Sequence, residues 1–366
     1  MHKTGSSSIQ NVFRHYDEDR TKYAELGFEN HSIPFYTAFS EDYLNYHIWA
    51  NLGLSKSEII NKKKECIKKI EEVLTNNKSD NLIFSGEDIS LLQQAEVKIL
   101  HELLSKHCEH ISVYAYLRSP QGFITSNFQE RVKAGLTENL FIPPEYEKKL
   151  NSFISIFGEN NVHFRMFDRK ALINNDIIDD FSQWVSTPSP QKQKNKTNES
   201  ISTEAVKYIY LLNKSNPLTT GEVGLIKARE DLVKTLRTIF PGAFKLPDNL
   251  ILPYIDNDDI DWIHKKSNIA FDETDLDWNM NENQLNNNEL DLFLTSISHD
   301  SALILRGYLQ SIGIKNDFDL SPVKLINKLY YVCLIRNQNI NEVKDSLAHK
   351  IKRKKENILN SILRKL

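Results

Sequence analysis

The first ten residues combine a lysine, a glycine and a run of hydroxyl side chains ahead of a helical pattern. Residues 2–10 read HKTGSSSIQ, and apolar side chains recur at helical spacing from Ile9 onward. A glycine permits a tight turn, and amides and hydroxyls at a helix start, beside a lysine, can bind an anion. We therefore predict an anion-binding loop, while serines here are also typical of ordinary helix N-caps. The candidate residues are Lys3, Thr4, Gly5, Ser6, Ser7 and Ser8.

A second candidate anion site follows the apolar run ISVYAYL at 111–117. Arg118 comes directly after this run, and Ser126 follows eight residues later in a helical pattern. A cation at the carboxyl end of a strand and a hydroxyl on the next helix can bind a phosphate where α/β sheets hold their ligands. Taken alone, this spacing is more typical of a surface arginine and an unrelated serine.

Two further residues are candidates for acid–base chemistry. Glu87, in FSGED after the apolar run at 82–84, is either a general base at the end of a strand or a helix cap, and Asp88 is better suited to the cap. His47 is a candidate base or acceptor ligand, or a half-buried structural histidine. A cluster of histidines and one cysteine near residues 101–110 lacks the spacing of a tetrahedral zinc module, so we predict no metal.

The elements that would position these residues form an alternating pattern. Three β-branched or aromatic runs, at 82–84, 111–117 and 162–167, are separated by helical patterns at 89–104, 123–132 and 150–157. Strands that alternate with helices predict an α/β fold, with a parallel sheet flanked by helices. Residues 186–200 lack apolar side chains apart from prolines and predict a flexible loop.

Together the motifs resemble the P-loop sulfotransferase family, and in particular its bacterial, carbohydrate-type branch. KTGSSS at 3–8 resembles the 5′-phosphosulfate loop of these enzymes, and LRSP with TS at 125–126 resembles their 3′-phosphate element. FSGED at 84–88 is similar to a Ser-Ser-Glu segment of the bacterial branch, and residues 157–181 are similar to a later strand and helix. The resemblance covers about residues 1–280 and implies a sulfotransferase-like domain of that extent.

The resemblance implies a donor, a reaction and roles for single residues. Lys3 and the loop would hold the 5′-phosphosulfate of 3′-phosphoadenosine 5′-phosphosulfate (PAPS), Arg118 and Ser126 its 3′-phosphate, and Glu87 would be the base. A sulfuryl group would pass in line to a hydroxyl or amine acceptor, with a glycan as the implied class, and adenosine 3′,5′-bisphosphate would be released without a metal. A kinase-like phosphotransferase is disfavoured, because the GxxxxGK[ST] motif is absent.

One departure from the family keeps a second hypothesis open. The family's loop follows a buried first strand, whereas Met1 and His2 stand directly before Lys3, so the first strand is apparently missing or truncated. Loss of a central strand would expose the backbone edges of its neighbours. The alternative is therefore a catalytically degenerate protein of the same fold that only binds ligands.

Composition sets limits on partners and location. The 366 residues carry 46 Lys and Arg against 49 Asp and Glu, a formal charge of −3, which argues against a nucleic-acid binder. No apolar run is long enough for a transmembrane helix, no secretory signal is recognisable, and three scattered cysteines fit a reducing compartment, so we expect a cytoplasmic protein. Residues 281–366 predict a helical extension with a basic amphipathic end. That end would contact a membrane surface or a protein partner, or pack on the main domain.

Overall fold

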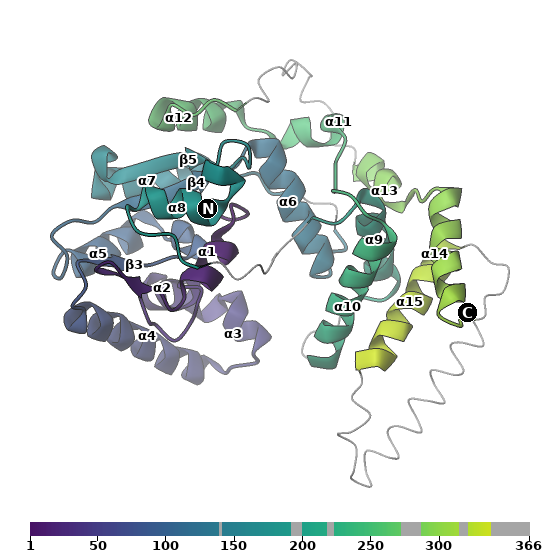
Figure 1. Cartoon of the computed structure of the whole chain (residues 1–366), viewed down its shortest axis with the longest axis horizontal. Coiled ribbons are helices and arrows are strands. Elements are labelled where there is room, and N and C mark those ends of the chain that lie inside the picture. The colour runs from purple at the N-terminus through teal and green to yellow at the C-terminus, as the bar shows by residue number, and fades with distance from the viewer. Residues whose placement is uncertain (139–140, 192–199, 218–222, 272–286, 315–320, 338–366) are drawn as a thin grey trace, which may run out of the picture. The chain divides into compact units, whose positions relative to one another are not determined.

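The computed structural model describes residues 1–138, 141–191, 200–217, 223–271, 287–314 and 321–337 (Figure 1). The chain forms two compact units that each draw on separate stretches of sequence. The first contains residues 1–124, 142–199 and 254–280, and the second contains 125–141, 200–253 and 281–366. Most of the predicted loop at 186–200 and the whole basic end of the tail lie outside the described residues.

The strands of the first unit form two small sheets. β1 (Asp17–Glu18) is antiparallel to β2 (Thr21–Tyr23), which is parallel to β3 (Asn81–Ile83). β4 (Val113–Leu117) and β5 (Val162–Met166) pair in parallel, with Val113 opposite Val162 and Leu117 opposite Met166. The predicted strands at 82–84, 111–117 and 162–167 are thus confirmed as β3, β4 and β5.

The mixed α/β class is confirmed, but the single parallel sheet that we expected is divided into two. β3 and β4 are consecutive strands along the chain, yet no backbone pairing joins them among the described residues. Their side chains nevertheless belong to the same two layers: Leu82 and Val113 pack in one apolar cluster, and Ile83 and Tyr116 in another. Because successive strand residues point to opposite faces, the two sheets share the same pair of covering layers.

Helices supply those layers. The helices of the first unit are α1 (Ser6–Phe13), α2 (Ser32–Phe39), α3 (His47–Asn51), α4 (Lys56–Asn76), α5 (Gln94–Leu104), the start of α6 (Pro120–Lys133), α7 (Tyr146–Phe157), α8 (Ile177–Trp184) and α12 (Asn257–Ser267). Local sequence explains their starts: Ser55 and Glu58 form a capping box on α4, and Asp176 accepts the amides of Ile178 and Asp179 at α8.

The two apolar clusters lie on opposite faces of the strands. One gathers side chains of α2, α4, α5 and α7, including Phe35, Ile70, Val97 and Phe153. The other gathers side chains of α1 and α8, including Phe13 and Phe181. α1 is therefore held on the sheet by its apolar face, which fixes the loop that precedes it.

The second unit is helical in its described residues. Its elements are the end of α6, α9 (Thr203–Ser215), α10 (Val223–Ile239), α11 (Asp248–Ile251), α13 (Asn287–Thr295), α14 (His299–Ser311) and α15 (Pro322–Asn337). The helical extension predicted after residue 280 corresponds to α13–α15, which share this unit with α9 and α10 from the middle of the chain. The domain boundary at residue 280 itself stays a prediction. In the part of the chain described here, no helix has the length and apolar character needed to cross a membrane.

Candidate functional site

The candidate anion loop is a tight turn that leads into α1. Lys3 and Gly5 have left-handed backbone conformations, with φ of 62° and 80°. A Cβ atom on Gly5 would lie 3.0 Å from the Phe167 ring and 3.1 Å from Ile177, so only glycine fits both the φ angle and the space. The turn is therefore packed against the end of β5 and the start of α8.

The hydroxyl side chains of the loop have different environments. Thr4 is buried, and its Oγ1 donates to the carbonyl of Met1 at 2.5 Å, so this hydroxyl holds the turn together. Ser6 and Ser8 are half-buried and Ser7 is exposed, all in the first turn of α1. The amides of this first turn lie at the positive end of the helix dipole, which favours an anion there.

Arg118 lies beside this loop. Directly after β4, its Nη1 donates to the carbonyl oxygen of Lys3 at 3.1 Å. The guanidinium stands over the Phe167 ring at 5.9 Å, and Tyr146 donates its hydroxyl to the Arg118 carbonyl. The structure thus brings together two motifs that are 115 residues apart in the sequence. Ser126 lies on α6 and is assigned to the second unit, so its pairing with Arg118 stays a prediction.

Glu87 also lies next to α1. It opens the short 3₁₀ helix η2 (Glu87–Leu91) after β3, and its carboxylate accepts the side-chain amides of Gln10 at 2.9 Å and Asn30 at 3.3 Å. Gln10 is buried on α1, so the carboxylate is attached to the helix that the loop begins. Lys3, Glu87 and Arg118 are therefore all near the carboxyl ends of β3 and β4, the edge where α/β sheets bind ligands.

A buried histidine fixes the segment that carries Glu87. His31 Nε2 donates to the carbonyl of Ala24 at 2.9 Å, and the Ser85 amide donates to His31 Nδ1 at 3.1 Å. Burial lowers the pKa of this imidazole to about 4, so the ring is neutral and can both donate and accept. At Gly86 a Cβ atom would lie 2.3 Å from the amide nitrogen of Ser32, so glycine is required for this close approach.

Sequence reasoning missed a polar network on the other side of the loop. His2 Nε2 lies 2.6 Å from Asp88 Oδ1, and the Tyr46 hydroxyl donates to Asp88 Oδ2 at 2.6 Å. Burial acts to raise the pKa of the Asp88 carboxyl, but the hydrogen bonds from His2 and Tyr46 and the charge of His47 lower it below its ordinary value. The available signal was a histidine directly before the candidate lysine and a second carboxylate beside Glu87.

His47 lies at the margin of this network. It begins α3, its side chain is exposed, and its ring meets Tyr46 edge-on at 4.8 Å. The half-buried structural role considered from the sequence is therefore not observed. A role as base or acceptor ligand stays a prediction.

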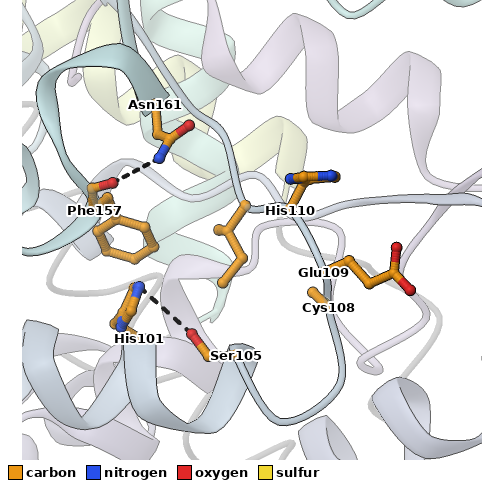
Figure 2. Close-up of a pocket in the computed structure, with 8 residues that line it drawn as sticks. His101, Ser105, Cys108, Glu109, His110, Phe157 and Asn161 are labelled. Atoms are coloured by element: carbon orange, nitrogen blue, oxygen red, sulfur yellow. Dashed lines mark hydrogen bonds between the residues drawn. The ribbon is translucent and has the colours of Figure 1, made fainter.

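A separate pocket of about 340 Å³ lies at the amino ends of β4 and β5, whereas Arg118 follows the carboxyl end of β4. Figure 2 shows the side chains that line this pocket. His101 packs edge-on against Phe157 at 4.8 Å between ring centroids and lies 3.5 Å from Ser105 Oγ. The residues that line the pocket are His101, Ser105, Cys108, Glu109, His110, Ile111, Phe157 and Asn161. Across the described ranges, no three His, Cys, Asp or Glu side chains are grouped so as to hold a metal ion.

The residues near the carboxyl ends of β3 and β4 are arranged so that they can hold an anion and move a proton. The loop and the residue before it offer a lysine, a histidine, backbone amides and hydroxyls, while the neighbouring strand ends offer an arginine and two carboxylates. Comparisons with models of known families, with characterised proteins and with solved structures found no match to this chain.

Proposed function

We propose that the chain is a sulfotransferase that moves a sulfuryl group from PAPS to a hydroxyl or amine acceptor. One observation carries the proposal: the Arg118 guanidinium donates to the backbone of Lys3, so the two motifs predicted to bind the two ends of one nucleotide lie together. The Gln10–Glu87 contact supports it, because it adds a carboxylate to the same edge.

Each residue would act through position and charge. The amides and hydroxyls of Ser6, Ser7 and Ser8 would bind the phosphosulfate at the start of α1. Lys3 would stabilise the negative charge that builds on the bridging oxygen as the sulfur–oxygen bond breaks. Arg118, with Ser126, would hold the 3′-phosphate through charge-assisted hydrogen bonds. A base at this edge, the role that the resemblance gives to Glu87, would take the acceptor's proton.

The acceptor class rests on the resemblance alone, and we propose a glycan. The alternative of a ligand-binding protein without catalysis is favoured by one feature, the division of the strands into two sheets. The two functions separate experimentally, because both predict binding of adenosine 3′,5′-bisphosphate but only the enzyme consumes PAPS.

Calorimetric titration with adenosine 3′,5′-bisphosphate tests the proposal. We expect binding by the unaltered protein and much weaker binding of ADP, which has no 3′-phosphate. Arg118→Ala should lower the affinity by about 10- to 100-fold, as expected for the loss of a charge-assisted hydrogen bond of roughly 1.5–3 kcal/mol. Arg20→Ala, which removes an arginine paired with Asp80 on the surface, is the control and should bind normally. Equal affinity for the two nucleotides would contradict the 3′-phosphate assignment, and the absence of binding would refute the proposed function.

A further inference from the structure

His2 and Asp88 form an imidazole–carboxylate pair directly beside the candidate catalytic lysine. The distance from His2 Nε2 to Asp88 Oδ1 is 2.6 Å, and the two side chains are 28% and 11% exposed. The histidine is thus partly open to solvent, while its carboxylate partner is largely enclosed.

Asp88 is held at both its carboxylate and its backbone amide. Its Oδ2 accepts the Tyr46 hydroxyl at 2.6 Å, and the Asp88 amide donates to Ser32 Oγ at 3.0 Å. Ser32 begins α2, Tyr46 precedes α3 and His2 belongs to the loop before α1, so three segments of the chain fix the orientation of Asp88. A carboxylate held in this way sets the tautomer of an imidazole, because it accepts the Nε2 proton and leaves Nδ1 with its lone pair. The described residues offer Nδ1 of His2 no protein partner.

Glu87 is differently placed. Both of its carboxylate oxygens accept amide hydrogen bonds, from Gln10 at 2.9 Å and Asn30 at 3.3 Å. These two bonds tie Glu87 to α1 and to the residues before α2, so they fit a residue that holds α1 and the 85–88 segment in place.

We infer that His2, oriented by Asp88, is the general base of the transfer, and that Glu87 positions the loop. The inference rests on the proposed function. The acceptor oxygen forms a bond to sulfur as the bond from sulfur to the bridging oxygen breaks, and the bridging oxygen leaves on the nucleotide with the electron pair. The acceptor's proton passes to Nδ1 of His2, and the resulting imidazolium is stabilised by the Asp88 carboxylate. Lys3, the next residue along the chain, neutralises the leaving oxygen.

The test uses the unaltered chain and PAPS with water as the acceptor, so the natural acceptor is not needed. Release of sulfate gives the rate, and calorimetry with adenosine 3′,5′-bisphosphate gives the affinity. His2→Ala should lower the rate by about 10²-fold or more, the usual contribution of a general base, with affinity changed less than about tenfold. Added imidazole should restore part of the lost rate, which a merely structural histidine would not allow.

Three further variants complete the design. Asp88→Asn should lower the rate with normal nucleotide affinity, because an amide cannot stabilise an imidazolium. Glu87→Gln should lower the rate by less than about tenfold, clearly less than His2→Ala, because it alters the side chain that positions the loop and leaves the base in place. His15→Ala removes an exposed histidine after α1 and should have no effect.

The outcomes separate the inference from the proposed function. An unchanged rate in His2→Ala, or a loss that imidazole does not restore, would overturn the role of His2 and leave the function standing. Nucleotide binding without any release of sulfate from PAPS would overturn both the role of His2 and the proposed transfer, and would favour the ligand-binding alternative. A protein that fails to bind the nucleotide at all would refute the proposed function itself.

Discussion

At the scale of single residues, position 3 is the most informative place in the loop. Its backbone is left-handed, with φ of 62°, a conformation that costs a residue with a Cβ atom about 1 kcal/mol relative to glycine. The other left-handed position of the loop, residue 5, is a glycine, whereas residue 3 is a lysine. Non-glycine residues persist in such conformations when the surroundings hold them there, as Arg118 does through the Lys3 carbonyl.

Replacement of Lys3 tests whether its ammonium group explains why a lysine, and not a glycine, occupies this left-handed position. Lys3→Ala should lower the rate of PAPS turnover by about 10²- to 10³-fold, since it removes a group that stabilises transition-state charge. Alanine keeps a Cβ atom, so the cost of the left-handed backbone is the same. Lys3→Arg retains the charge and is the matched control. Turnover by Lys3→Ala at the unaltered rate would remove Lys3 from the mechanism.

At the scale of elements, the imidazole of His31 joins the end of β2 to the end of β3. The ring bridges Ala24 and Ser85 by hydrogen bonds and stacks on Tyr23 with 4.5 Å between ring centroids. Because β2 and β3 are only three residues long each, the backbone bonds between them are few. The neutral imidazole therefore strengthens the connection between the two short strands β2 and β3, and it fixes the turn that carries Glu87 and Asp88.

This arrangement predicts a loss of stability in weak acid. Burial lowers the pKa of His31 from 6.5 to about 4 in the folded protein, so the unfolded chain binds the proton more readily. The contribution is fully present above pH 6.5 and is lost as the pH falls from 6.5 toward 4. Between pH 7 and pH 5 we expect the free energy of unfolding to fall by about 2 kcal/mol from this residue.

Denaturant titrations at the two pH values measure this loss. His31→Gln replaces the imidazole with an uncharged donor and acceptor, and its stability should depend less on pH over the same range. His163→Gln alters a histidine elsewhere in the first unit, on β5, and should keep the full dependence. An identical pH dependence in His31→Gln and the unaltered protein would show that His31 is not the group responsible.

The sequence allowed β3, β4 and β5 to be predicted but not β1 and β2. Runs such as VYAYL in β4 are apolar and β-branched or aromatic, so their pattern is visible locally. β2 reads Thr-Lys-Tyr, and it is a strand only because it pairs with β3 some 60 residues away, which no local pattern records. The helix expected over 89–104 is divided at Leu92, because Gln93 and Glu96 form a capping box that starts α5 anew.

The candidate site, like the strands, could be predicted from the sequence only in part. Lys3, Arg118 and Glu87 could be selected by residue type and by their place after a strand or before a helix. The His2–Asp88–Tyr46 network could not, because it joins residues separated by 86 and 42 positions. Its existence depends on how α2, α3 and η2 pack, and that packing is set by apolar side chains rather than by the polar residues themselves.

At the scale of the whole molecule, each unit is assembled from separate stretches of the chain, and its core depends on contacts between them. In the second unit, Arg229 of α10 is a buried example. Its Nε donates to the carbonyl of Lys133 at 2.6 Å, its Nη2 to that of Val132 at 3.2 Å, and Nη2 also reaches Asn213 of α9. The last carbonyls of a helix have no partner within the helix, so the guanidinium completes the end of α6.

Replacement of Arg229 should therefore disturb the second unit through two helices at once. Burial lowers the pKa of this guanidinium to about 10, and the three oxygens that accept its hydrogen bonds offset part of the desolvation cost. Arg229→Met keeps most of the volume but removes the donor to the Lys133 carbonyl and to Asn213 Oδ1, while the Val132 carbonyl keeps the Gly135 amide and Asn213 Nδ2 as donors. The loss should lower the free energy of unfolding by about 3 kcal/mol. Hydrogen exchange should rise at the end of α6 and along α9 and α10. β4 and β5 have their own core and should keep their protection.

Lys227→Met, an exposed change on the same helix, is the control. Equal loss of protection in β4 and β5 would mean that the two cores unfold as one cooperative body rather than as the two units that the contacts define.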